Sequence, residues 1–554
     1  MRRLRHVPIA WPVVPLLLLF FFLALDSMVA DSPTMDEQNH LTRGLTFLAT
    51  GDPHFSLEHP PLINTLSALP VFLLADVHIP LDDPSWGWRD GWYTFADRLL
   101  WQSGNDVTLV IFLARLPILF LTMGLALVGA RFARELWGNS RQAALFAFAV
   151  LLFDPNLLAH GRYTTTDLGG TLFLLLAAWL LWRLWTEADW RRWLAATVAL
   201  GLAFGSKLST LSFVPIFALL AVLPLYPDRS WRGAWRRLWQ YGAAGAGSLL
   251  VVWAIFGGQW ANFDFQSSLL QPLNAWRGPM PTFWSGIEQI LLISSGGRPS
   301  FLLGRFSDAG FPLYFPIAFL VKTPLPLLLL LPVALVMRLW RTSTRARALF
   351  LFVPAFLYFL LSIQSALNIG YRHLLPMLPF LYVLIAGIAA SSPEPGGAKW
   401  PRALLGLAAL SILGSTLLIH PYYLSYFNAA AGGPEQGGRI LIDSNIDWGQ
   451  DLIRLQEWLA ANEIAHVKLS WFGTADPAYY GIPYEPLPGV PRHFDLWWNV
   501  PFDRDHPVPG LYAISVSNLG EPPLRTDEKT VFAWFRAHEP DARIGYSIYI
   551  YDVR

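Results

Sequence analysis

Residues 107–130 read VTLVIFLARLPILFLTMGLALVGA, a stretch in which Arg115 is the only charged side chain. The hydrocarbon core of a membrane is about 30 Å thick, and a helix needs roughly 20 mostly apolar residues to cross it. This stretch therefore predicts a membrane-spanning helix.

The composition of the whole chain agrees with a membrane protein. The chain has 554 residues, of which 54% are hydrophobic and only 14% are charged, whereas an average soluble domain carries about 25% charged residues. The formal charge of +1 excludes the broad basic field that nucleic-acid binding requires. The chain has no cysteine, which excludes disulfides, thiolate metal sites and cysteine nucleophiles.

Ten further apolar segments have a length and composition typical of membrane spans. With the first, the eleven predicted spans lie near residues 11–30, 107–130, 142–159, 169–185, 193–206, 208–226, 240–257, 312–337, 348–363, 373–390 and 402–419. We therefore predict an α-helical polytopic membrane protein.

Lys and Arg fall unevenly on the two sides of these spans. Six connections on one side, the N-terminus among them, carry 19 cations, whereas the short turns on the other side carry only Arg162, Lys207 and Arg372. Because cytoplasmic loops are the cation-rich ones, this predicts a cytoplasmic N-terminus and an outward C-terminus. A cleaved signal peptide at the first segment is an alternative, although its apolar run is long for one.

Three outward regions are large. The first loop, 31–106, is acidic; the second, 258–311, contains an amphipathic stretch at 286–293 that predicts a helix in the membrane interface. The third is the tail, 420–554, for which we predict a small α/β domain beyond a transmembrane module of residues 1–419. Its Gly-rich stretch, 432–438, lacks the Lys-Ser/Thr of a phosphate loop and is interpreted as a linker.

Two β-α-β patterns can be drawn in the tail. The expected strands and helices are Arg439–Ile442, Gln450–Ala461, Val467–Phe472, Leu511–Ser517, Thr526–His538 and Ile544–Tyr551. The motif Asp443-Ser444-Asn445-Ile446-Asp447-Trp448-Gly449-Gln450-Asp451 has a spacing of acids that invites a calcium-loop reading. Arg454 stands where such a loop needs an acid, so we expect the start of a helix there instead.

Several acidic and histidine side chains lie just outside predicted spans. Asp36 and Glu37 follow the first span, and a carboxylate at the membrane surface can act as a general base; solvated helix-capping charge is the alternative. Glu58 and His59 precede Pro60-Pro61, which form either a stiff turn or a rigid ligand-binding element. Asp167 is either a helix N-cap or a second carboxylate facing the same cavity as Asp36.

Cations on the outward side indicate a functional site more strongly than these acids and histidines do, because Lys and Arg should be scarce on that side. Lys207 lies at the tip of a helical hairpin, Arg372 and His373 lie at another outward turn, and Lys322 falls inside a predicted span. Lysine in a span generally finds a partner or lines a polar cavity, unless it snorkels to the interface. Together these residues suggest an anionic, membrane-embedded ligand. Transfer of a sugar from a polyprenyl phosphate fits, since its leaving group is a phosphate that positive charge can stabilise.

The motifs at these positions resemble the GT-C glycosyltransferases. They are Met35-Asp36-Glu37, His59-Pro60-Pro61-Leu62, Thr166-Asp167, Gly205-Ser206-Lys207, Phe315-Pro316 with Lys322-Thr323-Pro324, and Arg372-His373-Leu374-Leu375-Pro376. Their order over residues 1 to about 420 is similar to bacterial members of the protein O-mannosyltransferase superfamily, which also includes the aminoarabinose transferases acting on lipid A.

The resemblance implies an inverting enzyme in the bacterial inner membrane that acts on the extracytoplasmic face. Asp36 would be the base that activates the acceptor, with Glu37 beside it, and Asp167 would shape the acceptor site. Lys207, Arg372 and Lys322 would hold the lipid phosphate, and Glu58, His59 and His373 would complete the substrate site.

The residues and the resemblance indicate classes of substrate and cofactor but not individual compounds. The expected donor is a polyprenyl-phosphate sugar, and the acceptor is a glycan, a lipid or a protein. Aminoarabinose transferases carry Lys where His59 stands, which speaks against that sugar, and 258–311 is too short for the β-trefoil domain of eukaryotic protein mannosyltransferases. No cofactor is required, although Asp36, Glu37, His59 and Asp167 offer possible ligands for a divalent metal.

Two other functions fit a polytopic membrane protein. A lipid-linked sugar flippase or transporter usually shows repeated halves and polar residues at the midplane, whereas here the polar residues gather at one face. A non-catalytic subunit that uses its spans only as an anchor would not need Lys207 and Arg372 on the outward side.

Overall fold

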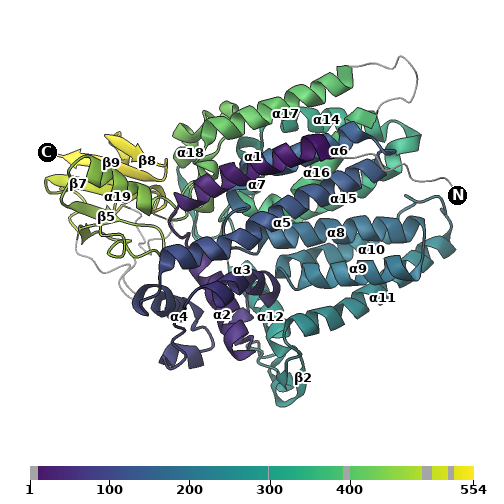
Figure 1. Ribbon diagram of the computed structural model, residues 1–554, viewed down its shortest axis with the longest axis horizontal. Helices are drawn as coiled ribbons and strands as arrows, with labels where there is room; N and C mark the ends of the chain where they lie inside the picture. Colours follow the sequence, from purple (N-terminus) through teal and green to yellow (C-terminus); the bar gives the residue numbers. More distant parts are fainter. Residues whose placement is uncertain (1–9, 297, 391–399, 490–501, 522–529) are drawn as a thin grey trace.

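The computed structural model describes residues 10–296, 298–390, 400–489, 502–521 and 530–554 (Figure 1). Helices cover all eleven predicted segments. They are α1 (Ala10–Val29), α5 (Val107–Leu136), α6 (Arg141–Phe153), α7 (Pro155–His160), α8 (Asp167–Thr186), α9 (Trp190–Phe204), α10 (Phe213–Val222), α11 (Trp231–Ile255), α13 (Tyr314–Lys322), α14 (Leu325–Leu339), α15 (Thr342–Ile363), α16 (Leu378–Ala386) and α17 (Trp400–Ile419), with 3-10 turns η4 (Leu208–Ser212), η6 (Tyr371–Met377) and η7 (Gly387–Ala390).

These helices form a bundle whose apolar length fits a membrane. Among the described residues, six helical segments are long and apolar enough to cross one, and the bent pair α13–α14 makes a seventh. Shorter apolar helices at Val13–Val29, Arg141–Phe153 and Leu208–Val222 coincide with three more predicted spans. The polytopic helical fold is thus confirmed, and the count of eleven crossings stays a prediction.

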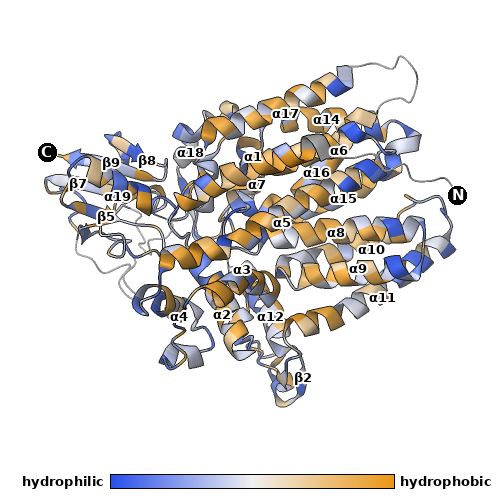
Figure 2. Ribbon diagram, in the orientation of Figure 1, coloured by the Kyte–Doolittle hydropathy of each residue, from blue (hydrophilic) through white to orange (hydrophobic). Residues whose placement is uncertain are grey.

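Polar and apolar residues separate along the bundle. Figure 2 shows apolar colour along α5, α8 and α17, and hydrophilic colour at the ends of α8, α9 and α15 that lie away from the tail. Figure 1 places the start of α1 at that end and the C-terminus at the other. The cation-rich connections and the tail therefore lie at opposite ends of the bundle.

One predicted span is broken. The segment 312–337 was expected to be continuous, but α13 ends at Lys322 and α14 begins at Leu325 at an angle of 107° to it. The break falls at Thr323-Pro324. Proline has no N–H to give to the preceding turn and disfavours helical backbone in the residue before it, so the helix stops there.

The first loop folds as a helical layer against α5. It contains α2 (Glu37–Thr50), η1 (His54–Ser56), α3 (Pro61–Leu74), η2 (Pro84–Gly87), α4 (Trp92–Asp97) and the π-helical turn η3 (Arg98–Gln102). Its buried residues, such as Leu41, Phe55 and Phe95, form a cluster with Val110 and Leu113 of α5. This packing fixes the loop, and with it the turn that carries Asp36, on the end of the bundle.

The second loop supplies a helix and two short hairpins. Strands β1 (Trp260–Asn262) and β2 (Arg277–Pro279) pair around η5 (Gln271–Ala275), and β3 (Ser300–Leu302) pairs with β4 (Arg305–Ser307). Between them lies α12 (Pro281–Gly296), which contains the expected amphipathic stretch. Glu288 of α12 accepts the backbone N–H groups of Gln266 and Ser267, which ties the first hairpin to this helix.

The tail contains a five-stranded mixed sheet. Its elements are η8 (Tyr423–Ser425), η9 (Ala429–Ala431), α18 (Pro434–Ile440), η10 (Asp443–Asn445), α19 (Leu452–Ala461), β5 (Val467–Ser470), β6 (Tyr484–Pro486), β7 (Gly510–Ser515), α20 (Val516–Leu519), α21 (Ala533–Arg536), β8 (Ala542–Ile544) and β9 (Ile548–Val553). The strand order is β6-β5-β7-β9-β8, with β5 parallel to β6 and β7 and with β9 antiparallel to β7 and β8.

Three details of the tail differ from the sequence prediction. Residues 439–442 do not form a strand; instead α18 covers 434–440 after Gly432 and Gly433, whose positive φ angles let the chain turn. The strand expected at 544–551 is split by a turn at Gly545-Tyr546 into β8 and β9. Part of the helix expected at 526–538 lies outside the described residues, and the rest forms only α21.

Asp31 joins the bundle, the first loop and the tail. Its carboxylate is 3% exposed, forms ion pairs with Arg162 and Arg454, and accepts a 2.6 Å hydrogen bond from the Tyr163 hydroxyl. Burial alone would raise the pKa of Asp31, but the charges of the arginines outweigh it and lower the pKa. This carboxylate therefore pairs with two buried guanidinium groups from distant parts of the chain, and Asp451 supplies a second carboxylate to Arg454.

We predict that Asp31→Asn lowers the free energy of unfolding by about 3–5 kcal/mol, because the change leaves buried Arg162 without its counter-charge and removes one of the two carboxylates that pair with Arg454. Thermal unfolding in detergent would show a clearly lower transition temperature. Asp26→Asn is the matched control, since the side chain of Asp26 is 69% exposed and, within the described ranges, forms an ion pair only with His420. Equal unfolding temperatures for Asp31→Asn and the wild type would contradict this account.

Candidate functional site

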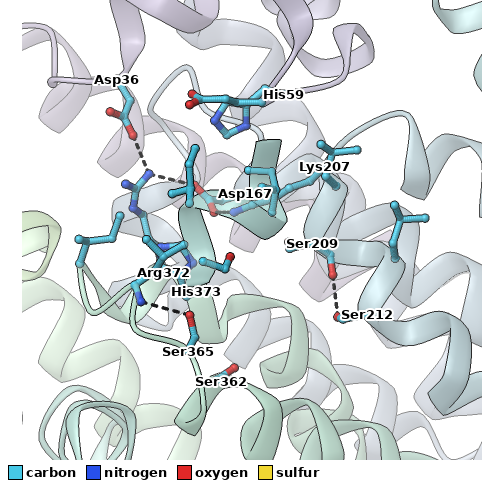
Figure 3. Close-up of a pocket in the computed structure, with 18 of the residues that line it drawn as sticks. Asp36, His59, Asp167, Lys207, Ser209, Ser212, Ser362, Ser365, Arg372 and His373 are labelled. Carbon is cyan, nitrogen blue, oxygen red and sulfur yellow. Dashed lines mark hydrogen bonds and ion pairs between the residues drawn. The ribbon is translucent and has the colours of Figure 1, made fainter. Parts of the chain in front are cut away.

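A cavity of about 440 Å³ lies where the first loop meets the end of the bundle. The residues predicted from the sequence that line it are Asp36, Glu58, His59, Asp167, Lys207, Arg372 and His373. They come from the start of α2, the turn before α3, the start of α8, the turn after α9 and η6 (Figure 3). Seven of the nine predicted site residues are thus brought together from five separate segments.

A chain of alternating charges crosses the cavity. Arg372 Nη1 lies 2.8 Å from Asp36 Oδ2 and 3.8 Å from Asp167 Oδ2, and Lys207 Nζ forms an ion pair with Asp167 Oδ1. Figure 3 shows Arg372 between the two carboxylates, with Lys207 on the far side of Asp167. Asp36 is the most exposed of the four, at 25% for its side chain. Each cation therefore has a counter-charge, and Asp36 is the member most open to a ligand.

Two histidines lie beside this chain. The rings of His40 and His59 meet edge to face with centroids 4.5 Å apart. His40 Nδ1 lies 2.9 Å from Asn64 Oδ1, and His59 Nδ1 lies 3.2 Å from Thr166 Oγ1. In each ring one nitrogen is used by the protein scaffold, which leaves the Nε2 side for the cavity.

The protonation states of this first-loop wall follow from burial and charge. Burial is the largest influence on His40 and lowers its pKa to about 4, and burial likewise holds the pKa of His59 well below its ordinary value. For Asp36, burial opposes ionisation, but the nearby charge of Arg372 is the largest opposing influence and the pKa is lowered. At neutral pH the wall thus carries two neutral imidazoles and one ionised carboxylate.

The cavity contains polar atoms without partners. Asn39 Oδ1, Arg372 Nε and His373 Nε2 are buried and have no hydrogen-bond partner in the described part of the chain, and all three residues line the cavity. A buried polar atom left unpaired costs about 1–3 kcal/mol. Three such atoms around one cavity are typical of a site whose ligand supplies the missing partners.

One wall of the cavity is apolar. It is formed by side chains of α12, η4 and the end of α15, namely Leu208, Leu211, Ile287, Ile290, Leu291, Ile293 and Leu361. The amphipathic stretch of α12 expected at the interface therefore lines the cavity. A ligand with a charged head and an apolar body matches this division.

Glu37 lies outside the cavity despite its neighbour Asp36. Its carboxylate is fully buried, pairs with Arg115 at 2.7 Å and accepts the backbone N–H groups of Thr34 and Thr164. Successive residues at the start of a helix point in different directions, so only one of the two acids can face the cavity. The catalytic role expected for Glu37 is not supported by this position.

Lys322 also lies away from the cavity. Its ammonium donates to the carbonyl oxygens of Leu424 and Asn445, at 2.8 and 2.5 Å, and faces the ring of Phe427. It is 2% exposed, so it does not snorkel to the surface. The expectation that Lys322 contacts a lipid phosphate is therefore not supported; this lysine binds the tail.

Asp167 is not the helix cap that the sequence allowed. It is the first residue of α8, and its side chain pairs with Lys207 and Arg372. The alternative, a carboxylate that shares a cavity with Asp36, matches the position observed.

Other cavity residues carry no clear signal in the sequence. Arg298, which follows α12, lines the cavity and forms no ion pair with the described residues. It lies in a long outward loop, where a cation is not unusual. Tyr93 and Asn39 carry no charge and no motif, so nothing in their local sequence marks them.

A metal site is not evident in the part of the chain that the structure describes. No group of three or more His, Asp or Glu side chains there has the geometry to hold a metal ion. Asp36 and Asp167 each face a cation, so their charge is already compensated. The expectation that no cofactor is required, with a divalent metal as a possible ligand, stays a prediction.

Part of the helical bundle matches the sequence model of a known protein family. Residues 105–256 match the sequence model of the dolichyl-phosphate-mannose-protein mannosyltransferase family. The resemblance to the protein O-mannosyltransferase superfamily is thus confirmed. The matched region of this mannosyltransferase-like chain includes Asp167 and Lys207. No curated protein sequence matches the chain.

Solved GT-C glycosyltransferases are similar to the structure at low identity. ArnT from Cupriavidus metallidurans bound to undecaprenyl phosphate has 14% identity and a TM-score of 0.47, with 97% of each chain covered. The Archaeoglobus fulgidus oligosaccharyltransferase with a tethered acceptor peptide has 10% identity and a TM-score of 0.45, with 74% of this chain and 55% of that chain covered. EmbB from Mycobacterium smegmatis has 14% identity and a TM-score of 0.38, with 76% and 39% covered.

We predict that neutralising Glu37 destabilises the protein more than neutralising Asp36 does. Glu37→Gln should lower the unfolding temperature in detergent, because the buried guanidinium of Arg115 loses its counter-charge. Asp36→Asn should lower that temperature less, since Asp36 is partly exposed and Arg372 keeps Asp167 at 3.8 Å. Thermal unfolding of the two purified variants side by side measures this, and a larger loss for Asp36→Asn would contradict the assignment of Glu37 to the scaffold.

Proposed function

We propose that this protein is a membrane glycosyltransferase that moves a sugar from a polyprenyl phosphate to an acceptor hydroxyl. The observation that carries the proposal is the cavity in which Asp36, Arg372, Asp167 and Lys207 meet beside an apolar wall. Such a cavity suits a phosphate head and an isoprenoid body. The match of residues 105–256 to a family named for a dolichyl-phosphate sugar supports the same donor class.

The cations of the cavity suit a phosphate monoester or diester. Arg372, Lys207 and Arg298 line one cavity, and Arg372 has a buried Nε without a partner. Guanidinium groups bind phosphate oxygens through two parallel N–H donors. We infer that the phosphate binds at Arg372 and Lys207 and takes over the N–H group that Asp36 now accepts.

Replacement of Asp36 by a phosphate at Arg372 would make Asp36 a stronger base. A carboxylate paired with arginine at 2.8 Å is a weak base, because the positive charge stabilises its ionised form. When a phosphate neutralises Arg372, the proton affinity of Asp36 rises. Donor binding therefore activates the base, and the acceptor is deprotonated only when the sugar is present.

The reaction follows as a direct displacement. Asp36 takes the proton of the acceptor hydroxyl as its oxygen attacks the anomeric carbon. The bond between that carbon and the phosphate oxygen breaks, and the electron pair leaves with the polyprenyl phosphate. Arg372, Lys207 and Arg298 stabilise the extra negative charge on that phosphate, and the anomeric configuration is inverted.

The remaining predicted residues receive supporting roles. His59, with His40 beside it, offers neutral hydrogen-bonding groups for sugar or acceptor hydroxyls, and Glu58 holds Arg43 at 3.4 Å. His373 presents an unpaired Nε2 to the cavity. Asp167 keeps Lys207 and Arg372 in place. We further propose that the cavity opens to the extracytoplasmic side of a bacterial inner membrane, because the cation-rich connections lie at the opposite end.

A flippase or transporter for lipid-linked sugars is the second candidate, since it also binds a lipid phosphate. A transporter leaves the bond between sugar and phosphate intact. Incubation of the purified protein with a panel of polyprenyl-phosphate sugars and an acceptor mixture separates the two functions, because only a transferase releases the free polyprenyl phosphate.

We predict that Asp36→Asn lowers turnover by at least 100-fold, the usual contribution of a general base, without weakening donor binding. Arg372 loses its nearer carboxylate in this variant and keeps Asp167 at 3.8 Å, so the affinity for polyprenyl phosphate should stay equal or increase. Release of polyprenyl phosphate and direct lipid binding measure the two effects. Asp82→Asn, an exposed acid of the same loop, is the control; an Asp36→Asn variant with wild-type turnover would refute the proposed base.

We also predict the acid limb of the pH profile. Asp36 has a pKa below its ordinary value near 3.8 and His40 has a pKa of about 4, so neither changes charge between pH 6 and 8. Donor-limited turnover, which reports the free enzyme, should be level in that range and should decline only below about pH 5. An inflection between pH 6 and 7 that His40→Gln abolishes would contradict these assignments.

A further inference from the structure

The tail motif at residues 443–448 lies directly against the segment that carries Arg372. We propose that this motif is part of the active site, in which Trp448 and Asn445 position Arg372 for the donor phosphate. The inference rests on the proposed function, and it gives the tail a role in donor affinity.

Hydrogen bonds fix the backbone on the N-terminal side of Arg372. Asn445 Oδ1 accepts the N–H of Tyr371 at 2.9 Å, and Ser444 Oγ donates to the carbonyl of Ile369 at 2.6 Å. The amide of Asn445 donates in turn to the Tyr314 hydroxyl at 2.9 Å. All of these groups are buried or part-buried, so their bonds are not exchanged with water. The tail therefore determines where η6 begins.

Gly370 allows this close approach. A Cβ atom on Gly370 would lie 2.1 Å from Ser444 Oγ, well inside any permitted contact. The segment before Arg372 and the tail motif are thus packed without space for a side chain between them. A displacement of the motif would carry the backbone of Arg372 with it.

Trp448 holds the guanidinium itself. Its ring lies 4.2 Å from the Arg372 guanidinium carbon and is 1% exposed. An aromatic face attracts a cation but leaves the N–H groups at the edge of the guanidinium plane free. A carboxylate would use the N–H donors of Arg372 and compete with a phosphate for them. Trp448 can orient Arg372 without using these donors.

Trp448 also contacts the backbone next to Asp36, the ion-pair partner of Arg372. The carbonyl of Trp448 accepts the N–H of Met35 at 2.9 Å, which is the residue before Asp36. His160 and Tyr163 pack edge to face on the indole, with centroids 5.8 and 6.1 Å away. One tail residue thus fixes the backbone beside the proposed base and the side chain of the phosphate-binding arginine.

Lys322 anchors the motif to the bundle. Its ammonium binds the carbonyls of Leu424 and Asn445, both in the tail. The break between α13 and α14 places this lysine at a helix end, where it can reach them. The lysine that the sequence assigned to a phosphate therefore acts on the site through the tail.

The test uses the full-length protein in nanodiscs and compares Trp448→Phe with Trp448→Leu. Phenylalanine keeps an aromatic face, whereas leucine keeps only apolar bulk. Affinity for undecaprenyl phosphate, the donor KM and kcat, and the unfolding temperature are measured for each. Trp471→Phe is the matched control, since Trp471 is a fully buried tryptophan of the tail that packs in the sheet core.

We expect Trp448→Leu to weaken undecaprenyl phosphate binding and to raise the donor KM by at least tenfold, with a smaller effect on kcat, and Trp448→Phe to restore most of both. Trp471→Phe should change neither, whatever it does to stability. Active Trp448→Leu protein with wild-type donor affinity and KM would overturn the inference, as would equal defects in the Phe and Leu variants. A wild-type protein that neither binds undecaprenyl phosphate nor releases it from a sugar donor would instead refute the proposed function, and this inference with it.

Discussion

The pair formed by Asp36 and Arg372 is the contact on which the site depends. A guanidinium buried at the end of a membrane bundle needs a counter-charge, because desolvation of an unpaired ion is costly. Asp36 provides that charge at 2.8 Å from a turn that the packed first loop and the carbonyl of Trp448 hold in place. A donor phosphate is also negatively charged and can take the place of Asp36 beside Arg372. The requirement of Arg372 for a negative partner is therefore met by Asp36 before the donor binds and by the phosphate afterwards.

Much of the cavity could be predicted from the sequence, since charge is rare in such a chain. Lys207 and Arg372 stand out on the side where cations are scarce, and their carboxylate partners follow predicted spans. The sequence could not separate Asp36 from Glu37, because their directions depend on how α2 meets Arg115, 78 residues away. Nor could it place Lys322, whose role depends on a helix break and on contacts with the tail.

In the tail, local sequence patterns predict some of the strands and helices but not the contacts with the bundle. Its strands at 467–470 and 510–515 and the helix at 452–461 coincide with elements of the two β-α-β patterns predicted from the sequence. The motif at 443–448 has no regular pattern, and its meaning lies in contacts with residues 369–372, more than 70 positions earlier. A tryptophan beneath an arginine is visible only after both have been brought together by the fold.

A structure of the protein with bound undecaprenyl phosphate would test the central claim most directly. The account predicts a phosphate within hydrogen-bonding distance of Arg372 and Lys207, the isoprenoid along α12, and an Asp36 carboxylate that no longer touches Arg372. A lipid phosphate bound outside this cavity, with the pair of Asp36 and Arg372 intact, would contradict it.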